Sequence, residues 1–195
     1  MRAKLAGIGL ILFLSACGPD ESSLTVYVDE LNAIEGQVTA EAGPLIAELE
    51  RVRTPNELKT TMEQLVAVRI DSLAASRALD PPEQVADLHD FFVEWEAQLI
   101  PVEEALAARA GTVAGWEELS ESDEMEAYRV TLIDGKQRCI EFQAKLDATA
   151  ARGVFADTPW IPGEMKEVVE AVLGCDLFPE NPENIWRLPS TTEPP

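Results

Sequence analysis

His89 is the single histidine of the chain, and acidic residues stand close to it: Asp87 and Asp90 flank it, and Glu94 and Glu96 follow. An imidazole beside carboxylates is the residue set of a general base or of a metal site. In a helix, Asp90 and Glu94 would lie one turn apart, on one side with Asp87. One helix cannot close the shell of a divalent ion, which takes about six oxygens or a tetrahedral set of nitrogen and sulfur ligands. We therefore predict no metal site around His89.

The rest of the sequence supplies no catalytic partner for His89. Ala86 stands three residues before it, where a Glu-x-x-His di-iron motif would need its glutamate. The patterns for haem attachment, zinc proteases, phosphate-binding loops and nucleophile elbows are missing as well. We predict no catalytic residue and no cofactor, and we place His89 at the edge of a core beside Val85 and Val93. A hydrolase-type enzyme that uses His89 and its carboxylates remains an alternative.

Residues 1–16 have the features of a secretory signal. Two basic residues come first, an apolar run extends from Leu5 to Leu14, and the small residues Ser15 and Ala16 follow. An apolar run of about ten residues is too short to span hydrocarbon, which takes about twenty. We predict a cleaved signal peptide, so that the mature protein lies outside the cytoplasm.

The signal ends on a cysteine, and Leu14-Ser15-Ala16-Cys17 resembles the lipobox of bacterial lipoproteins at every position. The resemblance implies a diacylglycerol thioether on Cys17, cleavage before it, and often a third acyl chain on the new amine. Two or more acyl chains hold a protein firmly on a membrane. Residues 18–22 would then be a tether of at most about 18 Å. We expect a lipid-anchored protein of the cell membrane or outer membrane, with its folded body close to the bilayer.

Two further cysteines, Cys139 and Cys175, lie in the second half of the chain. Neither has a second Cys or a His at ligand spacing, which argues against a zinc site. In an oxidising compartment an isolated pair favours a disulfide. Closing a loop of this length contributes about 4 kcal/mol in the chain-entropy model. We predict a disulfide between Cys139 and Cys175.

The composition is strongly acidic. Removal of residues 1–16 leaves 13 basic against 36 acidic residues, a formal charge of −23. Binding to nucleic acid and to anionic headgroups is driven by Lys and Arg, so this surface excludes nucleic acid as a partner. The carboxylates can instead attract cations, an envelope protein or another basic partner. Solubility in a salty habitat is the alternative explanation.

Apolar residues recur at steps of three and four along four segments, which predicts helices with one buried stripe each. The first extends over residues 24–52, and Pro44 predicts a kink or short break near Gly43. The second begins at the capping box of residues 54–57, which carries proline at the first helical position, and ends near Leu79.

The third predicted helix begins with the same start chemistry at residues 80–83, bends at Pro101 and stops near Gly111. Its apolar steps are the most regular of the chain. The fourth begins near Met125 and ends with a glycine cap at Gly153.

Two segments are less regular. The connection over residues 111–123 contains Trp116 and room for one helical turn, and its acidic run over 117–126 lacks the spacing and glycine of a calcium loop. We expect the last acids of this run to stabilise the positive end of the next helix. After Gly153, prolines break the chain into short pieces around one predicted helix over residues 163–173.

These elements predict an all-α fold: an up-and-down four-helix bundle with kinked helices and a disulfide-pinned C-terminal helix and tail. The bundle domain covers residues 23–189, and residues 190–195 are expected to be disordered. Pro44, Pro101 and Gly135 thin or bend three helices around Trp95. Trp95, Pro101 and Gly135 are therefore candidates to line a ligand pocket between helices, and a filled core is the alternative.

The segment Pro-Pro-Glu-Gln-Val-Ala-Asp-Leu-His-Asp, residues 81–90, together with the lipobox resembles uncharacterised helical lipoproteins of bacteria, actinobacterial ones especially. That resemblance implies a fold and a location and brings no activity with it. We expect a non-enzymatic, lipid-anchored envelope protein that binds or scaffolds other molecules. A receptor for a small ligand or a cation is the main alternative.

Overall fold

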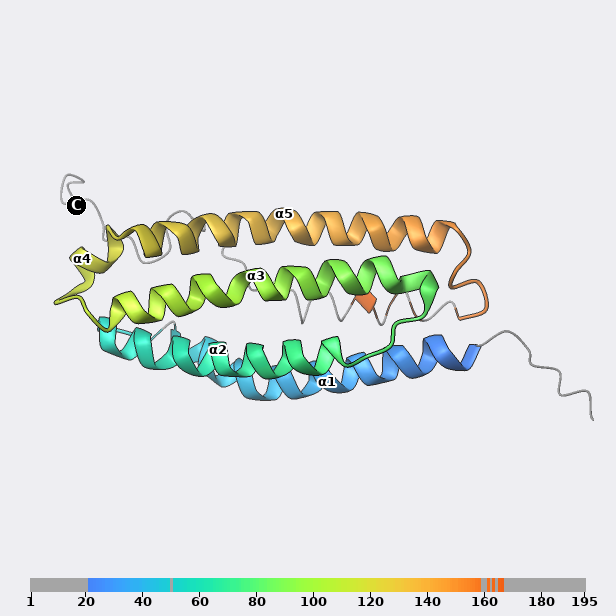
Figure 1. Ribbon diagram of the computed structural model, residues 1–195, viewed down its shortest axis with the longest axis horizontal. Coiled ribbons are helices and arrows are strands. Elements are labelled where there is room, and N and C mark those ends of the chain that lie inside the picture. The colour runs from blue at the N-terminus through green and yellow to red at the C-terminus, as the bar shows by residue number, and fades with distance from the viewer. Residues whose placement is uncertain (1–20, 50, 159–160, 162, 164, 167–195) are drawn as a thin grey trace, which may run out of the picture.

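A computed structural model describes residues 21–49, 51–158, 161, 163 and 165–166, and this part of the chain is helical, without strands (Figure 1). Its long helices are α1 (Glu21–Leu49), α2 (Pro55–Arg77), α3 (Ala86–Ala110) and α5 (Asp123–Ala151). Two short elements connect them, the 3-10 turn η1 (Glu83–Val85) and α4 (Trp116–Ser120). The prediction of an all-α fold is confirmed.

The long helices lie side by side and alternate in direction along the chain (Figure 1). The most extensive contact joins α2 and α3, and further contacts join α1 to α2 and α3 to α5. Neighbours in sequence are thus neighbours in space, as short connections require.

Apolar side chains form two separate cores along the length of the molecule. The first core lies at the start of α1, the start of α3 and the end of α5, and contains Tyr27, Val28, Leu31, Val85, Leu88, Phe92, Trp95, Leu99, Phe142, Leu146, Phe155, Ile161 and Met165. The second core lies at the opposite end and contains Val52, Leu58, Met62, Leu106, Ala107, Ala110, Leu119, Met125 and Tyr128. Buried polar side chains lie beside both cores, as His89 and Ser122 do, and also between them, as Glu103 does.

α2 begins at the capping box that the sequence predicts. The Thr54 hydroxyl accepts a hydrogen bond from the Glu57 N–H at 3.2 Å, and the Glu57 carboxylate accepts from the N–H groups of Thr54 at 3.0 Å and Arg53 at 2.8 Å. These two backbone hydrogen bonds, from Arg53 and Thr54, lower the pKa of Glu57. The predicted capping box, with Pro55 in the first turn, is confirmed.

The start of α3 does not follow the prediction that Asp80 would repeat this chemistry. Pro82 has φ −55° and ψ 144° and precedes η1, and α3 begins only at Ala86. A residue that precedes proline is pushed out of the helical region, and here two prolines come in succession, Pro81 and Pro82. Asp80 therefore lies outside the helix, and the prediction of its capping role is wrong.

The two interior prolines do not interrupt their helices. α1 continues through Gly43 and Pro44, and α3 continues through Pro101. The structure thus shows no break near Gly43, and the kinks expected at the two prolines stay predictions. Both prolines are exposed. The backbone carbonyl that each proline leaves without a donor thus lies near the solvent side of its helix, where water can bond to it.

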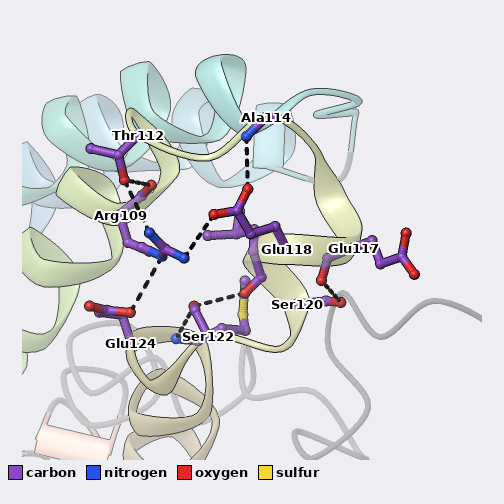
Figure 2. Close-up of polar contacts among 10 residues, drawn as sticks. Arg109, Thr112, Ala114, Glu117, Glu118, Ser120, Ser122 and Glu124 are labelled. Carbon is purple, nitrogen blue, oxygen red and sulfur yellow. Dashed lines mark hydrogen bonds and ion pairs between the residues drawn. The ribbon is translucent and has the colours of Figure 1, made fainter.

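The chain turns from α3 into α5 through α4, the helical turn predicted around Trp116. Figure 2 shows Arg109 at the centre of this corner: it donates to Glu118 at 3.0 Å and lies 3.9 Å from Glu124. Glu118 also accepts from the Ala114 N–H at 3.2 Å. The Trp116 indole donates to the backbone carbonyl of Arg53, which ties the corner to the chain just before α2.

The two ends of α5 agree with the sequence. Ser122 caps its start by accepting from the Met125 N–H at 3.2 Å, and Asp123, Glu124 and Glu126 stand in the first turn as predicted. After the last turn, Gly153 has φ +80°, a conformation that suits glycine at a helix end.

Several predictions concern residues outside the described part of the chain. These are the signal peptide, Cys17, Cys175, the tail over 190–195 and most of the helix expected over 163–173. Of that helix, Gly163, Met165 and Lys166 are described and helical, and Met165 is buried in the first core.

Candidate functional site

His89 lies inside the first core. Only 6% of its surface is exposed, and its Nδ1 lies 3.1 Å from the hydroxyl of Tyr27 on α1. The two rings meet edge to face with centroids 5.8 Å apart. Val85 belongs to the same core and Val93 packs against it, so the predicted surroundings of His89 are confirmed.

The environment of His89 favours a neutral ring. Burial lowers the pKa of His89, and the charge of Asp90 opposes that shift only in part. Burial, followed by Asp90, also raises the pKa of Tyr27. With its proton on Nε2, the neutral imidazole accepts a hydrogen bond from the Tyr27 hydroxyl at Nδ1. This hydrogen bond links α3 to α1. A buried imidazole engaged in this way suits a structural role better than proton transfer to a substrate.

The predicted pocket residues differ in their burial. Trp95 is buried in the first core with 4% of its surface exposed, and Gly135 is buried on α5. Pro101 is exposed on α3, so the prediction that it lines an interior pocket is wrong. Trp95 carries a buried indole N–H without a hydrogen-bond partner among the described residues.

The cysteines can be placed only in part. Cys139 is half-buried on α5 and packs against the first core, which agrees with the buried face predicted for it. Its predicted partner Cys175 lies outside the described residues, as does Cys17. The disulfide and the lipid attachment stay predictions.

A cluster of charged residues joins α2 and α3 near the middle of their lengths. Arg69 of α2 donates through Nε and Nη2 to both oxygens of Glu103, at 2.8 and 3.0 Å. Its Nη1 donates to both oxygens of Glu96, at 2.9 and 3.0 Å. The side chains of Glu96 and Glu103 are only 4% and 8% exposed, so one guanidinium holds two buried carboxylates of α3.

The protonation of this cluster follows from burial and from the shared arginine. Burial disfavours the charge of Arg69, but Glu103 and Glu96 outweigh it and raise the pKa of Arg69. Burial raises the pKa of Glu96, and Arg69 opposes that shift. Tyr128 of α5 has its pKa raised by burial and by the charge of Glu103. Tyr128 therefore stays protonated, and its pKa responds to the charge of the cluster.

Glu35 of α1 completes what we call the interior charge cluster: Glu35, Arg69, Glu96 and Glu103. Its surface is only 5% exposed, and neither carboxylate oxygen has a hydrogen-bond partner among the described residues. Burial and then the charge of Glu96 raise the pKa of Glu35 from 4.5 to about 8. A buried carboxyl without a donor is most stable in its neutral form, because an unpaired buried charge is very costly.

The interior charge cluster was not predicted from the sequence, although the sequence contains a signal for it. Val28, Leu31, Glu35, Val38 and Ala42 follow one another at alternating steps of three and four, so Glu35 occupies a core position of α1. Arg69 likewise interrupts the apolar stripe of α2. Two charges of opposite sign at core positions of neighbouring helices are the pattern that predicts an interior ion pair or a buried carboxyl.

The chemistry open to the cluster is limited by its composition. It contains carboxylates, one guanidinium and a nearby phenol, which can hold and release protons. Among the described residues, no group of three or more His, Cys, Asp or Glu is arranged to hold a metal ion. The cluster is thus a candidate for proton binding.

Comparison with known proteins adds no assignment. No protein-family model matches the sequence, and neither a curated protein nor a solved structure matches it significantly. Of the helices in the described part of the chain, none combines the length and the hydropathy that crossing a bilayer would require.

Proposed function

We propose that this chain is a lipid-anchored extracytoplasmic protein whose helical body binds or scaffolds another component of the cell envelope. The observation that carries the proposal is the sequence Leu14-Ser15-Ala16-Cys17 behind a short apolar segment. Acyl chains on Cys17 would hold the body at the membrane without a spanning helix. The membrane is then the cell membrane or the outer membrane.

The position of α1 supports a body held close to the bilayer. α1 begins at Glu21, so the last two residues of the predicted tether are already helical. Residues 18–20 would separate Cys17 from the first helical turn, a reach of at most about 14 Å. A partner bound to the bundle would thus be held near the headgroups.

The anchor is tested by replacing Cys17. The wild-type chain expressed in a bacterial host should incorporate radioactive palmitate and sediment with membranes. Cys17→Ser should lose the label and appear in the soluble fraction. A Cys139→Ser control, which leaves the motif intact, should keep the label. Membrane fractionation of Cys17→Ser together with an unlabelled parent would contradict the proposal.

The charge of α1 supports a basic partner. α1 carries six acidic residues and no basic one, and its acids at positions 29, 30, 41 and 48 are exposed. This surface repels anionic molecules and speeds the approach of cationic ones at low salt. We therefore propose a protein partner with a basic surface, bound along α1.

In-cell crosslinking followed by identification of the captured protein tests this step. Neutralising four exposed acids of α1 (Asp29→Asn, Glu30→Gln, Glu41→Gln and Glu48→Gln) should reduce capture severalfold at low salt. A matched control removes the same charge from α2 and α3 (Glu63→Gln, Asp71→Asn, Glu94→Gln and Glu104→Gln) and should capture normally. Equal losses in both variants would show that net charge, and not α1, is responsible.

We further propose that α1 and α5 belong to one four-helix bundle and that a Cys139–Cys175 disulfide pins the segment after α5. Residues of both helices in the first core, together with Met165, support this arrangement. Thiol titration of the denatured mature protein without reductant tests the disulfide. Two reactive thiols would contradict it.

A further inference from the structure

Within the part of the chain that the structure describes, the carboxyl of Glu35 has no basic partner. Arg69 is the basic residue of the interior charge cluster, and its Nε, Nη1 and Nη2 all donate to Glu96 or Glu103. Glu35 lies on α1, and both of its carboxylate oxygens are buried and have no hydrogen-bond partner among the described residues. The neighbouring charge that raises its pKa is another carboxylate, that of Glu96.

We propose that Glu35 is a proton-sensitive group that controls how tightly α1 packs against α2 and α3. With its proton, Glu35 is neutral and can remain in the interior beside Glu96. Without its proton, Glu35 adds an unpaired charge to a cluster that already holds two carboxylates on one guanidinium, and hydration of that charge requires α1 to move away.

The charged and titratable groups that the described helices contribute to the cluster favour this behaviour. α2 contributes Arg69, which is already bound; α3 contributes Glu96 and Glu103; and α5 contributes Tyr128, whose raised pKa keeps it uncharged. Burial, with help from Glu96, raises the pKa of Glu35 to about 8. We call the form with α1 packed against α2 and α3 the closed form, and the form with α1 moved away the open form. In the open form Glu35 regains its ordinary pKa near 4.5. The closed form therefore keeps a proton that the open form releases between these two pH values.

Linkage gives the size of the effect. Between about pH 5.5 and 7.5 the open form gains about tenfold over the closed form for each pH unit, and the gain levels off above about pH 8. The inference does not depend on the lipid anchor. If the anchor is present, the loosened helix is the one that follows the attachment site directly.

Hydrogen exchange of α1 amides in the full chain tests the proposal. Protection factors, corrected for intrinsic exchange, should fall about tenfold per pH unit from pH 5.5 to 7.5 in α1 and much less in α3. Glu35→Gln, which keeps the shape and removes the titration, should make the α1 protection flat. Glu30→Gln, at an exposed position of the same helix, should behave like the wild type.

A second measurement decides the matter even if Glu35→Gln fails to fold. The side-chain carboxyl carbon of Glu35, followed by NMR in the wild type, should titrate near pH 8. A midpoint below about pH 6, or the same pH dependence of α1 protection in wild type and Glu35→Gln, would overturn the proposal.

Discussion

Arg69 and Arg109 each pair with two glutamates, and the surroundings of the two arginines differ. Arg69 holds Glu96 and Glu103 between α2 and α3, where those carboxylates are 4% and 8% exposed. Arg109 meets Glu118 and Glu124 at the α4 corner, where the carboxylates are 50% and 39% exposed (Figure 2). The residue types are the same, and the carboxylates paired with Arg69 differ from those paired with Arg109 in how far water reaches them.

That difference decides what each arginine does. In water an ion pair gains little, because both charges are already solvated and salt screens them. In the interior the carboxylates have given up water, so the arginine is needed to keep them there. The interior group therefore controls whether the helices pack, and the corner group adjusts a connection that other contacts also hold.

Replacement of Arg69 should have the largest effect. Arg69→Met leaves Glu96 and Glu103 buried without a counter-charge, which should lower the free energy of unfolding by about 3–5 kcal/mol. Urea denaturation at neutral pH measures this loss, with Arg109→Met as the matched control. A loss below about 1 kcal/mol would show that water reaches the two carboxylates despite their burial.

A variant without the charges sharpens the same test. Arg69→Met combined with Glu96→Leu and Glu103→Leu removes the arginine together with its partners, and apolar side chains of similar volume fill the site. This triple variant should be close to the wild type in stability, because the cost in Arg69→Met comes from the stranded carboxylates. Equal instability of the single and triple variants would place the cost in lost packing instead.

The second largest effect should come from the titration of Glu35, as a dependence of the free energy of unfolding on pH. The folded state keeps the Glu35 proton up to about pH 8 and the unfolded state loses it near 4.5, so the folded state binds more protons in between. The free energy of unfolding should therefore fall as pH rises through this window, by up to about 1.4 kcal/mol per pH unit. Denaturation of Glu35→Gln between pH 5 and 8 should show a weaker slope, and Glu30→Gln should keep the wild-type slope.

The sequence predicted the elements that depend on local chemistry. The capping box at Thr54 and the glycine after α5 are contained within a few residues, so their signals need no knowledge of neighbours. The buried position of His89 was also predictable, because it lies within the most regular apolar pattern of the chain. The predicted capping role of Asp80 was wrong because the two prolines that follow it keep the chain out of the helical conformation.

Features that depend on how helices are rotated against one another were harder to predict. Pro101 lies in a helix with one long buried face, and only the structure places Pro101 on the exposed side. Glu35 occupies a core position in the apolar pattern, but its environment depends on where Arg69 and Glu96 lie on two other helices. Pairing between helices cannot be read from one helix at a time.

The cap at the start of α5 should give the third effect. Ser122 is buried; its hydroxyl accepts from the Met125 N–H at 3.2 Å and donates to the Leu119 carbonyl at 2.8 Å. Ser122→Ala leaves the Met125 amide unsatisfied, while the Leu119 carbonyl keeps the hydrogen bond from the Ser122 backbone N–H at 3.1 Å. The substitution should cost about 1–2 kcal/mol in thermal or urea denaturation. Ser120→Ala, at the half-exposed end of α4, should cost less, and the reverse order would mean that α4 holds the corner.

Replacement of Arg109 should have the smallest effect, and one that responds to salt. Arg109→Met removes the 3.0 Å contact to Glu118 and the 3.9 Å contact to Glu124, both largely in water, so the loss should stay below about 1 kcal/mol. Because salt screens exposed pairs, the difference from wild type should shrink between 0.05 and about 1 M NaCl. The loss in Arg69→Met should persist at high salt, since salt does not enter the interior. If both losses vanished together, burial would not separate the two arginines, and the contrast between the interior and the corner would fail.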